Sequence, residues 1–171
     1  MGSEKGHFWE NAYGISLSDE LEKLKSIAET FKRLNRKVLL IGLLDKAQSE
    51  YDKYDFETGE KTLLEAYNID PNNPAVLRGL GCIEQFGKSN YEKALEYFFK
   101  ALEFSEKKEI EYTLIGMVYY FDEKLDDAVK YFNLAIDEND DYAEAYEGRN
   151  QAMLENHLKI IDLQESLKKY F

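Results

Sequence analysis

The sequence predicts an all-α fold made of repeated units, and three observations support this. The chain of 171 residues is 44% hydrophobic with only two prolines and ten glycines, as in a globular helical protein. Apolar residues recur at helical spacing before the repeats begin. A small residue followed by an apolar one recurs at separations of 35 and 34 residues, as Ala66-Tyr67, Ala101-Leu102 and Ala135-Ile136. We expect one domain, because the chain is too short for two independent enzymes.

The chain starts with an N-terminal arm at residues 1–16, followed by a leading amphipathic helix at 17–37. The arm contains the only tryptophan, Trp9, which we expect either to pack on the protein's own helices or to dock into a second copy. A turn at Asn35-Arg36-Lys37 is expected to fold the apolar stripe of the leading helix onto the first repeat. The stripe comprises Leu17, Leu21, Leu24, Ile27, Ala28, Phe31 and Leu34.

The repeat array covers residues 38–155, with units at about 40–73, 74–108 and 109–142 and a partial unit at 143–155. The second helix of each unit is expected to open at Phe56, Tyr91 and Leu125, again 35 and 34 residues apart. Leu80-Gly81 and Ile115-Gly116 form another repeated pair, and the matching place further on is Asn150. A C-terminal capping helix is expected at 156–171, either continuous with the partial unit or broken from it near Asn156.

The third unit matches one known repeat at eight positions. The signature residues are Tyr112, Ile115, Gly116, Tyr119, Leu125, Ala128, Phe132 and Ala135. The second unit matches with one extra residue in the turn "FGKSN", and the first is degenerate. The pattern resembles the tetratricopeptide repeat (TPR), whose unit is a pair of antiparallel helices of 34 residues. This resemblance implies a right-handed α-α superhelix of antiparallel helix hairpins, a TPR-like solenoid.

Small residues and turn residues fit the same units. Gly81 and Gly116 are expected where the helices of a hairpin cross, because a missing Cβ lets them approach closely. Pro71 is expected to end one helix and Pro74 to open the next. Ser89 with Glu92 predicts a capping box. The large side chains expected to fill the spaces between neighbouring hairpins are Tyr112, Tyr119 and Phe132.

Charge and composition argue against several classes of function. The net charge is −12, and residues 41–171 carry 15 basic and 28 acidic side chains, which would repel nucleic acid phosphates and anionic lipid. Because the sequence has no run of eighteen apolar residues and no secretory signal, we expect no membrane partner and a cytoplasmic location. The single cysteine, Cys82, excludes an internal disulfide and fits a reducing compartment.

The sequence contains no recognisable catalytic or metal-binding pattern. His7 and His157 have no ligand partner at a suitable spacing. The segment from Asp137 to Gly148 begins like a calcium loop but lacks the glycine and the final glutamate that such a loop needs. Cys82 is expected to be a buried or groove-lining small residue rather than a nucleophile. We therefore expect no enzyme, no cofactor and no metal.

The resemblance also implies where a partner would bind. In TPR proteins the first helix of each hairpin lines a concave groove that holds peptides. The corresponding residues are Leu44, Gln48, Tyr51, Arg78, Cys82, Gln85, Phe86, Thr113, Met117, Tyr120 and Phe121. The carboxylate clamp of chaperone-binding members is absent, because its places hold Leu44, Gln48, Gly79, Ile110 and Leu114. We expect a non-enzymatic module for a protein or peptide segment with apolar side chains and an occasional acid for Arg78.

Alternatives stay open at this point. The layout also resembles small acidic secretion-type chaperones, which guard hydrophobic client proteins. The arm and the leading helix instead suggest a self-assembling scaffold, as in a homodimer. An enzyme or metal-binding domain that uses Cys82 or the acidic residues is the third possibility.

Overall fold

The computed structural model describes residues 17–168, in which all regular elements are helices. They are α2 (Leu17–Asp52), α3 (Phe56–Ile69), α4 (Pro74–Cys82), the π-helix η1 (Ile83–Gly87), α5 (Tyr91–Phe104), α6 (Lys108–Phe121), α7 (Leu125–Glu138) and α8 (Ala143–Lys168). The predicted all-α class is confirmed. The predicted arm at 1–16, with Trp9, lies outside the described residues.

Contacts divide the chain into two compact units after Gly42. Helix α2 is unbroken from Leu17 to Asp52, so the turn predicted at Asn35-Arg36-Lys37 is wrong. The physical reason is local: these residues include neither glycine nor proline, and arginine and lysine favour helix. The apolar stripe of the first unit is solvent-exposed, with Leu24 and Phe31 each 62% exposed.

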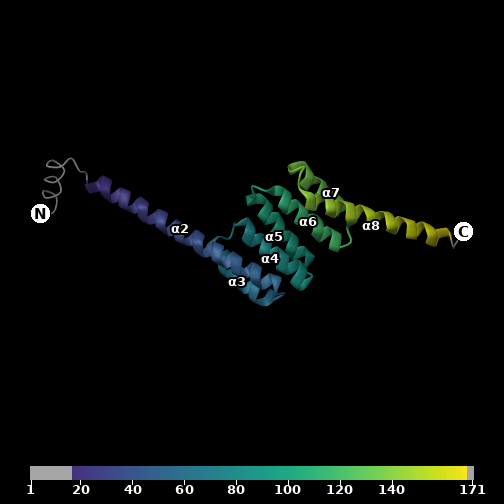
Figure 1. Ribbon diagram of the computed structural model, residues 1–171, viewed down its shortest axis with the longest axis horizontal. Coiled ribbons are helices and arrows are strands. Elements are labelled where there is room, and N and C mark those ends of the chain that lie inside the picture. The colour runs from purple at the N-terminus through teal and green to yellow at the C-terminus, as the bar shows by residue number, and fades with distance from the viewer. Residues whose placement is uncertain (1–16, 169–171) are drawn as a thin grey trace. The chain divides into compact units, whose positions relative to one another are not determined.

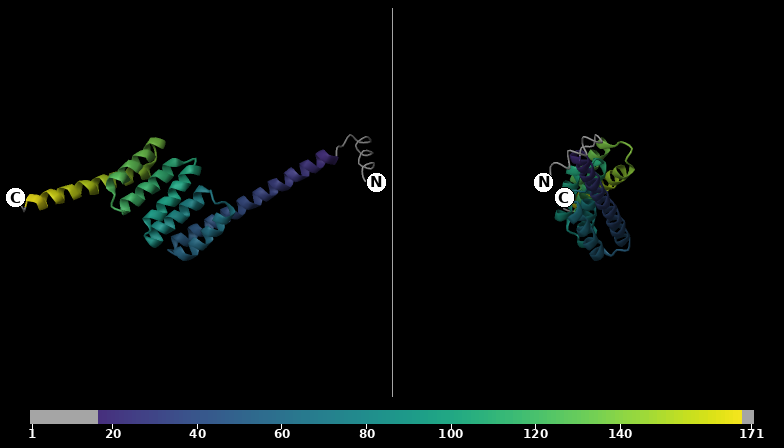
Figure 2. Two further views of the ribbon diagram at one scale, coloured as in Figure 1. Left: turned by 180° about the vertical axis from the view of Figure 1, so that it is seen from behind. Right: turned by 90° about the vertical axis from the view of Figure 1, so that its left-hand side faces the viewer.

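The second unit is a row of antiparallel helix hairpins. Helices α3 to α7 lie side by side in chain order, and α8 follows α7 (Figure 1). The view from behind shows the same order (Figure 2). The predicted opening residues Phe56, Tyr91 and Leu125 are confirmed as the first residues of α3, α5 and α7.

Helix α8 runs unbroken from Ala143 to Lys168, so the break considered near Asn156 is absent and no interruption marks the predicted boundary at 155/156. The segment after Gly148 contains neither glycine nor proline. The Asn156 side chain itself donates a hydrogen bond to Asp126 Oδ1 at 2.8 Å. The partial unit and the predicted capping helix are therefore one element.

Helix ends follow the turn residues of the sequence, with one exception. Helix α3 ends at Ile69, and Pro74 opens α4 behind the cap Asn73, whose side chain accepts from the N–H of Ala75 and Val76. The roles predicted for the two prolines are confirmed. The predicted capping box is wrong, because the cap of α5 is Asn90, which accepts from the N–H of Lys93 at 3.2 Å. Ser89 instead takes the left-handed conformation in the preceding turn.

The second hairpin holds one residue more than the other two. In the first and third hairpins the closing bond runs from Asp55 N to Glu50 O and from Lys124 N to Tyr119 O, each spanning five residues. In the second it runs from Asn90 N to Glu84 O and spans six. The extra residue coincides with the π-helix η1, whose bonds reach one residue further than those of an α-helix.

Two buried phenyl rings occupy the places where helices cross. A Cβ at Gly81 would come within 2.5 Å of the Phe98 ring, and one at Gly116 within 2.9 Å of the Phe132 ring. The close approach predicted at both glycines is confirmed, with a side chain as the neighbour. Phe132 also contacts Gly148 of α8, a position that the repeat spacing had placed at Asn150. Phe132 therefore joins α6, α7 and α8.

Candidate functional site

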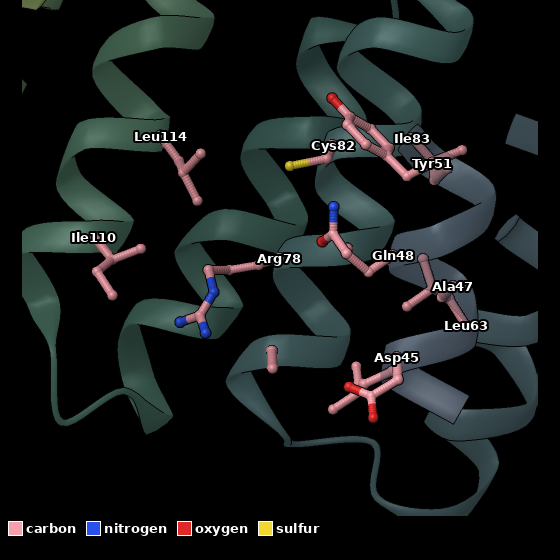
Figure 3. A pocket seen from close by; sticks show the side chains of 13 residues that line it. Asp45, Ala47, Gln48, Tyr51, Leu63, Arg78, Cys82, Ile83, Ile110 and Leu114 are labelled. Atoms are coloured by element: carbon pink, nitrogen blue, oxygen red, sulfur yellow. The ribbon is translucent and has the colours of Figure 1, made fainter. Parts of the chain in front are cut away.

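One cavity of the second unit lies between the first helices of the hairpins. It has a volume of about 490 Å³, and its wall is mainly apolar. Figure 3 shows Arg78 and Cys82 on α4 between Gln48 and Tyr51 of α2 and Ile110 and Leu114 of α6. The remaining wall residues are Leu44, Asp45, Ala47, Leu63, Ala75, Gly79 and Ile83.

A second cavity, of about 230 Å³, lies where α6, α7 and α8 meet. Its wall includes four of the residues predicted for the groove, all on α6: Thr113, Met117, Tyr120 and Phe121. Helix α8 supplies Glu144, Glu147, Gly148 and Gln151, and α7 supplies Phe132. Both cavities are therefore lined partly by the first helix of a hairpin.

An aromatic row, defined as Tyr51, Phe86, Phe121 and Tyr120, joins the two cavities. The ring centroids of Tyr51 and Phe86 are 6.5 Å apart, those of Phe86 and Phe121 5.7 Å, and those of Phe121 and Tyr120 5.6 Å. All three pairs meet edge to face, a favourable geometry. Phe86 is 40% exposed and Phe121 45%, so part of the row faces solvent.

Nine of the eleven predicted groove residues line one of the two cavities, and Phe86 and Gln85 line neither. Five line the first cavity: Leu44, Gln48, Tyr51, Arg78 and Cys82. Thr113, Met117, Tyr120 and Phe121 line the second, and Phe86 lies between them in the aromatic row. Gln85 lines neither cavity.

Gln85 is buried within η1, 3% exposed, and its amide has no hydrogen-bond partner in the described part of the chain. The prediction that it faces the groove assumed an α-helix, in which each residue advances by about 100°. The wider π turn changes the direction of its side chains. The structure therefore puts Gln85 inside the protein.

Arg78 is engaged in an ion pair that the sequence did not reveal. Its Nη1 lies 2.6 Å from Oε1 of Glu111 on α6, and the Glu111 side chain is fully buried. Burial raises the pKa of the Glu111 carboxyl, although the Arg78 guanidinium acts in the opposite direction. A buried carboxylate requires such a partner. Arg78 therefore neutralises Glu111 before any ligand arrives.

Two titratable groups on the first cavity are neutral near pH 7. Burial raises the pKa of the Cys82 thiol to about 11, although nearby Arg78 acts to lower it. Burial likewise raises the pKa of the Tyr51 hydroxyl to about 12. A protonated thiol is a poor nucleophile. Cys82 therefore behaves as a small apolar wall residue.

The charge left on the two cavities is negative. With Arg78 paired to Glu111, the first cavity retains the carboxylate of Asp45. The second cavity carries Glu144 and Glu147. The wall thus offers apolar surface bordered by acids, a combination that favours basic side chains in a ligand.

Sequence reasoning missed several wall residues, mainly Leu63, Ala75 and Ile83. Leu63 belongs to the second helix of its hairpin, so a search of first helices alone could not find it. Ile110 and Leu114 were noticed only as places where a clamp is missing. Their apolar character was the signal that they belong to the wall.

Solved structures of TPR domains share this arrangement of helices. The Sgt2 TPR domain from Aspergillus fumigatus matches with a TM-score of 0.62 and 14% identity, over 69% of this chain and 79% of that one. The chain has the TPR fold. The second TPR domain of human RPAP3, in complex with an HSP70 peptide, matches with a TM-score of 0.60 and 14% identity, over 69% of this chain and 98% of that one.

The TPR fold also occurs within a larger enzyme among the matches. An O-GlcNAc transferase from Thermobaculum terrenum matches with a TM-score of 0.64 and 19% identity, over 69% of this chain but 22% of that one. No protein-family model matches the chain, and no curated protein matches it in sequence. The likeness therefore establishes the TPR solenoid predicted from the sequence.

Residues 17–168 contain no group of three histidine, cysteine, aspartate or glutamate side chains placed to hold a metal ion. None of the helices within that range is long and apolar enough to cross a membrane.

Proposed function

We propose that this TPR array is a protein-interaction module that binds an apolar peptide segment along the two cavities and the aromatic row. The observation that carries the proposal is their continuity, because rings from three successive hairpins connect one cavity to the other. Partly exposed aromatic side chains beside apolar hollows are typical of the residues that dominate binding energy.

Similar proteins support a peptide as the ligand. The RPAP3 domain that shares the fold is in complex with an HSP70 peptide ending in the acidic sequence EEVD. The groove of this chain has the opposite charge preference, since Asp45, Glu144 and Glu147 border it and Arg78 is already paired. We infer that the ligand combines apolar side chains with lysine or arginine, rather than the acid first expected for Arg78.

The module acts by binding, and no residue of the groove has a catalytic role in this proposal. Cys82, whose thiol lies on the first cavity, is protonated at neutral pH because its thiol pKa is about 11. The second TPR domain of RPAP3, in complex with an HSP70 peptide, is an example of this fold holding a peptide.

Selection from a random peptide-display library, followed by affinity measurement on synthetic peptides, tests the proposal. We expect selected peptides to carry aromatic or aliphatic residues with lysine or arginine. The Phe121→Ala variant should weaken them by about 10-fold or more, as truncation of a central aromatic side chain does.

Phe104→Ala is the matched control, because Phe104 is 43% exposed, close to the 45% of Phe121, and belongs to α5 outside both cavities. Equal affinity of the two variants for the selected peptides would remove the aromatic row from the binding site. Selection of acidic peptides would refute the inferred charge preference.

A further inference from the structure

Helix α2 carries an apolar stripe of six side chains in the first unit that is exposed throughout. We call it the α2 stripe: Leu24, Ile27, Phe31, Leu34, Val38 and Ile41. Each of these side chains is between 52% and 62% exposed. Six large apolar groups in one line on a single helix face exceed the scattered apolar residues of an ordinary surface.

The spacing of the α2 stripe is that of a coiled coil. Successive members are three, four, three, four and three residues apart, which places all six at the a and d positions of consecutive heptads. A strict 3.5-residue period keeps one seam facing a partner helix when the two helices supercoil. The stripe is therefore patterned for another helix of the same kind.

We propose that the α2 stripe pairs with the α2 stripe of a second copy of this chain, in an antiparallel coiled coil. In this arrangement Leu24 lies opposite Ile41 of the other copy, and Phe31 lies opposite Leu34. Every a position then meets a d position, so the pattern is complementary to itself. The pairing is independent of the groove and of its proposed ligand.

The exposed area of the α2 stripe is large enough for an interface with a second copy of the helix. Six half-exposed apolar side chains present roughly 600 Å² per copy, so a symmetric pair would bury roughly 1,200 Å², the lower end of the range for stable interfaces. The stripe extends over five helical turns, long enough for more than two heptads of contact. A second α2 helix therefore covers the whole stripe with one contact.

The charges that flank the centre of this register are mixed. Lys32 lies opposite Arg33 of the other copy, whereas Glu29 lies opposite Arg36. The proposed direction therefore rests on the a-to-d matching of the α2 stripe.

The mass of the full chain in solution, measured by sedimentation equilibrium at micromolar concentration, tests the pairing. We expect twice the 20.0 kDa of the chain. The double variant Phe31→Glu, Leu34→Glu should raise the dissociation constant by about 100-fold or more, because it puts four carboxylates into the centre of the seam.

The matched control is Leu154→Glu, Leu158→Glu on α8, which adds the same charge at side chains 61% and 51% exposed. It should leave the mass doubled. A monomeric wild type, or a dimer lost in the α8 variant and kept in the α2 variant, would overturn the proposal. Circular dichroism shows whether each variant keeps its helix content.

Disulfide trapping decides the direction and does not depend on destabilising variants. In a Cys82→Ser background, the Leu24→Cys and Ile41→Cys variants are oxidised separately and as a mixture. We expect a cross-linked dimer in the mixture and little from either variant alone. Rapid cross-linking of the Leu24→Cys variant with itself would show a parallel pair and overturn the proposed arrangement.

Discussion

Replacing Arg78 by methionine should destabilise the second unit, because it leaves the buried Glu111 carboxylate without its partner. The two charged groups are 2.6 Å apart, and the Glu111 side chain has no exposed surface. Removing one member of a buried ion pair costs about 3–5 kcal/mol. With a typical urea dependence, that loss lowers the midpoint of urea unfolding by about 2 M.

The pKa of Glu111 determines how the destabilisation of the Arg78→Met variant changes with pH. Burial already raises the pKa of Glu111 in the folded protein, although Arg78 opposes it, and removal of Arg78 raises that pKa further. A carboxyl whose pKa is raised in the folded state binds its proton more tightly there than in the unfolded chain. The destabilisation that it causes therefore grows as the pH rises above its pKa in the unfolded chain. The deficit of the variant should therefore shrink between pH 7 and pH 5.

Urea unfolding followed by circular dichroism at several pH values measures these effects. The double variant Arg78→Met, Glu111→Gln should recover most of the lost stability and show no such pH dependence. An Arg78→Met variant within about 1 kcal/mol of wild type at pH 7 would refute the reasoning, as would a deficit that does not change with pH. The result also decides how Arg78 is used in binding studies, because charge reversal there places two acids together and tests stability instead of affinity.

Two further predictions concern the cavities and the helix crossings. Cys82 should react with iodoacetamide at pH 8 about 100-fold more slowly than an unstructured cysteine, because a thiol pKa of about 11 leaves little thiolate. A reaction rate equal to that of glutathione would contradict this prediction. Gly148→Ala should destabilise by about 1–2 kcal/mol in urea unfolding, because the new Cβ would lie within 2.5 Å of the Phe132 ring. The loss should vanish in a Phe132→Leu background, and equal losses from Gly148→Ala in both backgrounds would contradict the proposed contact. Gly42→Ala, with nothing within 4 Å of its Cβ, should instead stabilise by up to about 1 kcal/mol.

The sequence predicted the repeated elements well, because their packing requires particular residue sizes at fixed spacing. Phe56, Tyr91 and Leu125 open α3, α5 and α7 as expected. The missing Cβ of Gly81 and Gly116 is a requirement of close helix packing, and such a requirement is visible in one sequence. These features are local in origin.

The groove was harder to predict, because it depends on contacts between distant residues. Arg78 and Glu111 are 33 positions apart, and no local pattern pairs them. Gln85 lies in a π-helix, which cannot be predicted from residue types alone. Ser89 matched a capping pattern, but its neighbour Asn90 performs that function one residue later. In each case a tertiary or backbone detail overrode a sound local rule.

The true turn between α2 and α3 lies between Asp52 and Phe56, and not at 35–37, where a turn was predicted. Neither segment contains glycine or proline, yet one is a helix and the other a turn. At the true turn, Tyr54 takes the left-handed conformation and Asp55 caps α3 by accepting from Thr58 N at 3.2 Å. A capping residue, and not a helix-breaking residue, marks this corner.

The six-residue closure of the second hairpin shows how an insertion can change the proposed binding surface without any substitution in that surface. Deleting one residue between Glu84 and Asn90 would let α4 continue as an ordinary α-helix into a turn like the other two. The side chains at its end would then rotate, and Gln85 would be drawn toward the face that holds Tyr51 and Tyr120 in the neighbouring hairpins. Length variation in this one turn is thus a route by which related arrays could evolve different ligand preferences while keeping the same core.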